Sequence, residues 1–122
     1  MVRQSRGSDR PSGAKPKIDK VETRFLTDNL RWSPDGHRIY VGGQVTSVDT
    51  VLACVESTTV VNRPNVPFQI DSLDPKTLTL TPIIPATTFG EMGLGTGAIK
   101  VNGNYWISTA HGDRIAIVPA GK

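Results

Sequence analysis

The chain has 122 residues, a length typical of one domain. Only 37% of its residues are hydrophobic, 34 are β-branched (Thr, Val or Ile) and 21 are Gly or Pro. β-Branched side chains favour strands, whereas frequent Gly and Pro interrupt helices, so the composition excludes a helical bundle and predicts an all-β fold. The net charge of +3 arises at the N-terminus, because residues 1–20 hold six basic and two acidic side chains and the remaining 102 residues hold eight basic and nine acidic ones.

Residues 1–17 contain almost no apolar side chains and several Gly, Ser and Pro, so we expect a disordered basic tail there. Basic tails attract phosphates, but no aromatic side chain is interleaved with these charges, which argues against nucleic acid as a partner. The chain has neither an apolar run of about 18 residues nor a signal-peptide core, so we expect no membrane contact and, by default, a cytoplasmic location. The single cysteine, Cys54, excludes an internal disulfide and is expected to be a small buried residue.

Short apolar runs bounded by turn residues predict a series of strands over residues 18–122. The sequences Ser33-Pro34-Asp35-Gly36 and Asn102-Gly103 are typical of tight turns. The glycine-rich stretch 90–97 is expected to be a loop. In chain order, the expected strands cover residues 18–25, 29–32, 37–43, 48–55, 67–73, 78–81, 98–101, 105–109 and 113–118.

Two segments share one pattern, in which a short strand is followed by a turn that ends in Gly and by a longer apolar strand. Asn29–Gly43 has this pattern and Ala98–Ala110 repeats it, with the turn glycines Gly36 and Gly103 67 residues apart. A propeller blade usually repeats at about 40–50 residues. We attribute the excess to an inserted loop within residues 46–66. The repeat predicts a partial β-propeller of about two four-stranded antiparallel blades.

The segment from Thr27 to Gly36 (TDNLRWSPDG) resembles the six-bladed propellers of the gluconolactonase, regucalcin and paraoxonase (arylesterase) group, to which strictosidine synthase is related. The segment from Gly95 to Ile115 (GTGAIKVNGNYWISTAHGDRI) is similar to the closing blade of that group. Pro67–Pro75 is similar to one of its strand ends. The resemblance covers residues 18–120 and implies that residues 18–122 are the two C-terminal blades of such a propeller.

The resemblance implies a calcium ion, or another divalent metal, that activates a lactone or ester carbonyl for hydrolysis by water. Asp28 and Asn29 match the Asp-Asn pair of the group and are the expected metal ligands; the alternative is an Asx turn at a strand start. Thr96, Ala110 and His111 are expected to border the substrate. His111 is also the candidate catalytic residue, either as a proton shuttle or, alternatively, only as a histidine of an exposed turn.

A complete six-bladed domain needs roughly three times this much propeller sequence, so most ligands of the family's metal site are absent from the chain. Gln44 stands where the paraoxonase branch has a histidine. The expected function is that of a calcium-dependent lactonase or arylesterase that acts on a small lactone or ester, present here as an incomplete fragment. The alternative is a non-catalytic propeller fragment that serves as an interaction module, pairs with other blades or self-associates.

Overall fold

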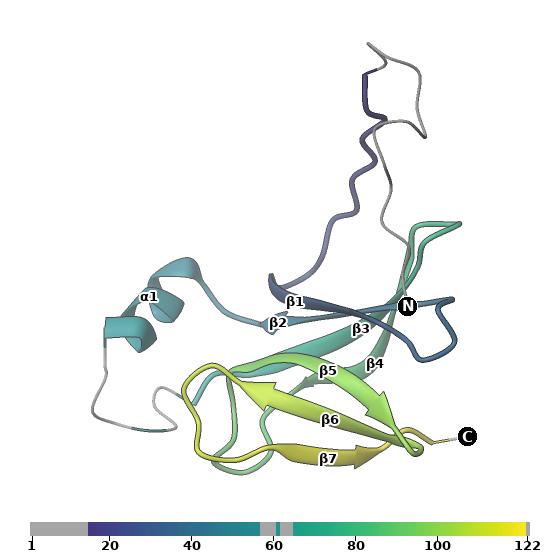
Figure 1. Cartoon of the computed structure of the whole chain (residues 1–122). Helices are drawn as coiled ribbons and strands as arrows, with labels where there is room; N and C mark the ends of the chain where they lie inside the picture. The colour runs from purple at the N-terminus through teal and green to yellow at the C-terminus, as the bar shows by residue number, and fades with distance from the viewer. Residues whose placement is uncertain (1–14, 57–60, 62–64, 122) are drawn as a thin grey trace.

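The computed structural model describes residues 15–56, 61 and 65–121, so most of the tail expected over residues 1–17 lies outside the described residues. The fold consists mostly of β-strands, with two antiparallel sheets and one short helix (Figure 1). In chain order the elements are β1 (Leu26–Trp32), β2 (Ile39–Gln44), α1 (Val48–Glu56), β3 (Phe68–Asp74), β4 (Thr79–Thr87), β5 (Gly95–Val101), β6 (Asn104–Thr109) and β7 (Ala116–Pro119).

Both sheets are meanders in which neighbouring strands follow one another in the chain. The first sheet has the order β1-β2-β3-β4 and the second has the order β5-β6-β7. The two sheets stack on each other, and β5 lies against β1, β2 and β3 of the first sheet (Figure 1). The prediction of a strand-rich fold is confirmed, whereas the second sheet has three strands within the described residues and not the expected four.

The main core lies between the facing sides of the two sheets, which we call their inner faces. Alternate residues of each strand point inward, and Phe68, Ile70 and Ile107 have no exposed surface there. Tyr40 of the first sheet meets Tyr105 of the second edge to face, with ring centroids 5.6 Å apart. Burial raises the pKa of both phenols. The period-2 pattern of these strands therefore produces one apolar layer between the sheets.

The two sheets come very close to each other at Gly42 of β2 and Gly97 of β5. A Cβ atom on Gly42 would lie 2.7 Å from the Cα atom of Gly97 and 2.9 Å from the backbone oxygen of Thr96. A Cβ atom on Gly95 would overlap the ring of Phe68. Glycine is required at these positions because a side chain would push the two backbones apart.

Two turns that the sequence predicts are present. In the β1–β2 connection, the carboxylate oxygen Oδ1 of Asp35 accepts hydrogen bonds from Oγ of Ser33 (2.6 Å) and from N of His37 (2.9 Å). These two bonds hold the pKa of Asp35 below its usual range. Between β5 and β6, Asn102 and Gly103 both have positive φ, 50° and 78°, which is the pattern of a type I′ hairpin turn.

The strand predicted over residues 48–55 is wrong, because this segment forms α1. Val48 and Leu52 recur at helical spacing, and Oγ of Ser47 accepts a hydrogen bond from N of Thr50 at 3.3 Å, as an N-cap does. The β-branched residues suggested a strand, but the cap and the spacing determine the local structure. Figure 1 shows α1 to one side of the stacked sheets.

The strand expected over residues 18–25 is also absent, since residues 15–23 have no regular structure and β1 begins at Leu26. Cys54 lies in α1, but its side chain falls outside the described part of the chain. Its burial therefore stays a prediction.

Each sheet begins with an edge strand that contains a β-bulge near its N-terminal end. In β1, Asp28 and Asn29 together lie opposite the single residue Gly42 of β2. In β5, Thr96 is the extra residue relative to β6. A bulge bends its strand and redirects side chains, so the same end of both sheets is shaped in the same way.

The two sheets can be aligned on their bulges by matching Asp28 of β1 to Thr96 of β5. In β2 and β6, the resulting correspondence differs by one residue from the repeat seen in the sequence, which matches Gly36 to Gly103. Arg31 of β1, which pairs with Tyr40, then corresponds to Ile99 of β5, which pairs with Trp106. Tyr40 lies on the inner face of the first sheet, whereas Trp106 lies on the outer face of the second. In Figure 1, β1 and β5 run in the same direction and the later strands of each sheet follow on the same side, so the two sheets are stacked head to tail, with both turned the same way, and are not related by a two-fold axis.

Two phenylalanines in contact test the position of the core. Phe68 has no exposed surface, whereas Phe89, whose ring centroid is 5.6 Å away, is 36% exposed. We expect Phe68→Ala to lower the free energy of unfolding by about 3–5 kcal/mol, because it leaves a cavity between the sheets. Phe89→Ala is the matched control, with an expected loss of about 1 kcal/mol. Urea denaturation measures both values, and equal losses would contradict this core.

Candidate metal and ligand site

Asp28 and Asn29 lie in the bulge of β1. In a regular strand two successive side chains point to opposite faces, but a bulge removes both residues from that alternation. Both side chains are exposed. A carboxylate and an amide, each with an oxygen that can bind a hard cation, are thus accessible next to each other at the edge of the first sheet.

Gln44, at the end of β2, connects this bulge to the second sheet. Its side chain is buried, and its Nε2 donates to Oδ2 of Asp28 at 3.2 Å and to the backbone oxygen of Gly95 at 3.0 Å. The two hydrogens of the amide are thereby both used. Asp28 therefore bonds to a side chain of β2, in contrast to the backbone N–H bond of the Asx turn that was the alternative.

Thr96 and Ala110 lie near the same end of the stacked sheets. Thr96 is buried, and its Oγ1 is 2.7 Å from Oγ of Ser108. Ala110 is exposed, and its N donates to the backbone oxygen of Leu94 at 3.0 Å. Thr96 directly follows Gly95, whose carbonyl accepts from Gln44, and the Ala110 backbone extends the pairing of β5 and β6.

His111 follows directly after this end of β6 and is half-buried. Within the described residues, its Nε2 is the one buried side-chain N or O atom without a hydrogen-bond partner. No hydrogen bond or ion pair of the described residues joins His111 to Asp28 or Asn29. The structure therefore leaves the imidazole with an unused nitrogen and does not link it to the bulge.

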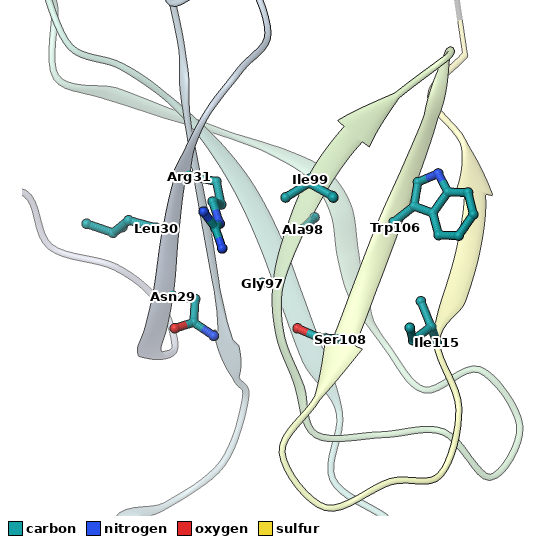
Figure 2. A pocket seen from close by; sticks show the side chains of 9 residues that line it. All are labelled: Asn29, Leu30, Arg31, Gly97, Ala98, Ile99, Trp106, Ser108 and Ile115. Atoms are coloured by element: carbon teal, nitrogen blue, oxygen red, sulfur yellow. The ribbon is translucent and has the colours of Figure 1, made fainter. Parts of the chain in front are cut away.

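A groove of about 380 Å³ lies beside the bulge, between β1 and the outer face of the second sheet. Figure 2 shows Asn29 and Arg31 pointing from β1 toward this groove, whereas Leu30 points away from it. Trp106 and Ile115 line its far side and supply apolar surface. The groove thus combines an amide and a guanidinium with an apolar wall.

Arg31 and Ser108 belong to this region but were not expected there from the sequence. A signal for Arg31 was present, because in a regular strand it would share the side of Asn29. The two side chains do point toward the same groove (Figure 2). Ser108 had no such signal, since its contact with Thr96 depends on the pairing of β5 with β6.

The residues of the bulge fit part of a calcium site. Asp28 and Asn29 supply two oxygen-bearing side chains, while the hydroxyl of Thr96 is already bonded to Ser108. Nowhere in residues 15–56, 61 and 65–121 do three or more His, Cys, Asp or Glu side chains form a group that could hold a metal ion. Because calcium takes about six to eight oxygen ligands, further donors would have to complete the site.

Comparison of the chain with protein-family models, with curated proteins and with solved structures finds no match. Among the described residues, no helix is long and apolar enough to cross a membrane.

Replacing Gln44 tests the connection between the sheets. We expect Gln44→Ala to lower the free energy of unfolding by about 2 kcal/mol, because the buried carbonyl of Gly95 loses its donor. Asn65→Ala is the matched control, since Asn65 makes the same kind of amide-to-carbonyl bond, to Gly90 at 2.9 Å, on the exposed surface. A loss below about 0.5 kcal/mol is expected there. If thermal unfolding gives both variants the same loss, Gln44 does not connect the sheets.

Proposed function

We propose that the chain is a pair of β-propeller blades that supplies part of a calcium site for the hydrolysis of a lactone or ester. The observation that carries this proposal is the bulge of β1, which exposes Asp28 and Asn29 together at the end of the stack where Thr96 lies. The head-to-tail relation of the two meanders supports the propeller part of the proposal, because consecutive blades repeat in the same orientation. The resemblance of residues 27–36 and 95–115 to lactonase-type propellers supports the choice of reaction.

In the proposed reaction, a bound calcium ion would polarise the carbonyl of the substrate. Asp28 and Asn29 would hold the ion, and the amide of Gln44 would keep the carboxylate of Asp28 in place through its 3.2 Å hydrogen bond. Thr96 and Ala110 would border the substrate. Nε2 of His111 is buried and has no partner within the described residues, so it would accept a proton from a water molecule bound beside it.

Two ligands leave most of a calcium coordination sphere to be supplied by other blades. In the chain alone, the proposed affinity is therefore in the millimolar class, and efficient hydrolysis requires the completed ring.

The second candidate is a non-catalytic interaction module, and the observation that favours it is the set of large apolar side chains exposed on both outer faces of the stack.

A calcium titration tests the proposed site. Calcium that binds the native state raises stability by about 1.4 kcal/mol at a concentration ten times its dissociation constant. We expect the thermal midpoint of the chain to rise with millimolar calcium and to return to its original value after chelation. Asp28→Asn should reduce this response because it removes the one negative charge of the pair.

Asp49→Asn is the control variant, since Asp49 is an exposed aspartate in the first turn of α1, outside the bulge. It should respond to calcium as the unmodified chain does. The proposal fails if calcium leaves the midpoint of the unmodified chain unchanged, or if Asp28→Asn and Asp49→Asn respond equally.

A further inference from the structure

The outer face of the second sheet presents a row of apolar side chains that the described chain leaves partly exposed, beside the groove that β1 borders. Ile99 pairs with Trp106, and Trp106 pairs with Ile117, so the three side chains lie side by side across β5, β6 and β7. They are 43%, 39% and 53% exposed. Val101 and Ile115 flank the row and are exposed as well. A continuous apolar surface of this kind indicates a contact with another molecule.

The outer face of the first sheet has an apolar row of its own. Trp32, Ile39, Leu73 and Leu80 are successive cross-strand partners in β1, β2, β3 and β4. Trp32 is 48% exposed. Residues 21–24 lie beside Asp71, Leu80 and Pro82, and Val41 and Asp71 are buried, so this part of the face is already covered within the chain. Ile39 and Leu73 of the row remain half-buried.

When the two sheets are aligned on their bulges, each residue on an outer face corresponds to a residue on the inner face of the other sheet. Trp106, on the free face of the second sheet, corresponds to Tyr40 on the inner face of the first. Ile39, on the free face of the first sheet, corresponds to Tyr105 on the inner face of the second. Tyr40 and Tyr105 are in contact within the chain. The outer face of the second sheet thus corresponds to the inner face of the first, and the outer face of the first corresponds to the inner face of the second. The two inner faces already pack together.

We infer that a second copy of this chain packs the outer face of its first sheet on the outer face of the second sheet, and so continues the stacking that the chain begins. In this arrangement Trp106 lies against Ile39 of the partner subunit, as Tyr40 lies against Tyr105 within one subunit. The contact joins two different faces, so each copy still has one free face after pairing, and a ring is the closed form. Because propellers have about four to eight blades and each copy supplies two sheets, the ring contains about two to four copies.

This inference shares the head-to-tail relation of the sheets with the proposed function, but it requires neither calcium nor hydrolysis. Its test can therefore fail while the calcium titration succeeds, and the reverse is also possible. The occupant is a second copy because the free faces match each other in the same way as the two faces already in contact.

The test is the mass of the chain in solution, measured by size-exclusion chromatography with multi-angle light scattering. The unmodified chain should elute with a mass between two and four times the 13.1 kDa of one copy. Trp106→Arg, on the second sheet, and Trp32→Arg, on the first sheet, should each raise the dissociation constant by at least about 30-fold, the effect of losing one central anchor. Leu52→Arg, at an exposed position of α1, is the control and should leave the mass unchanged.

Mixing the two variants distinguishes contact between different faces from contact between identical ones. Trp106→Arg keeps an intact first-sheet face and Trp32→Arg keeps an intact second-sheet face, so an equimolar mixture should form a dimer although neither variant associates alone. Ile117→Arg replaces Trp106→Arg if circular dichroism shows that the latter does not fold. A monomeric unmodified chain, or a mixture that stays monomeric, would overturn the inference, as would association of Trp32→Arg by itself.

Discussion

The close contact between the backbones of β2 and β5 is the constraint on which the rest of the structure depends. Gly42 and Gly97 have no side chains, so the two sheets come within van der Waals distance where these strands cross. Two residues further along β2, the amide of Gln44 can then reach the carbonyl of Gly95 in the other sheet, at 3.0 Å. The same amide holds Asp28 at 3.2 Å, so the packing of the sheets also determines the geometry of the candidate site.

The head-to-tail relation of the sheets connects the two proposals. Stacked units of one orientation bury one face of each sheet and leave large apolar side chains exposed on the other, as Trp32 and Trp106 illustrate. They also bring the bulges of β1 and β5 to one end, which is where a ring of such units would gather ligands from several blades. Under the two proposals, the small number of candidate ligands and the exposed apolar side chains have one physical explanation, which is that the chain would form part of a larger stack.

Local signals predicted much of the fold. The Asn102-Gly103 turn is present because both residues tolerate positive φ, and the apolar runs around Tyr40 and Ile107 form buried strands. The helix α1 was mistaken for a strand because its short β-branched run fits both structures. Asp28 and Asn29 could be identified as candidates from their order in the chain alone. Their link to Gln44 and Gly95 could not, because Gln44 and Gly95 are 51 residues apart in sequence and meet only when the sheets stack.

The most direct test is the nuclear Overhauser effect between the Hα protons of Gly42 and Gly97. A Cβ atom on Gly42 would lie 2.7 Å from the Cα of Gly97, and one Hα of Gly42 points in that direction, so a strong cross-peak is predicted. Gly43 is the internal comparison, because its corresponding Hα points toward Leu26 and Phe25 and should give no cross-peak to Gly97. If the Gly42–Gly97 cross-peak is missing while the cross-strand peaks within each sheet are present, the two sheets do not stack in this way.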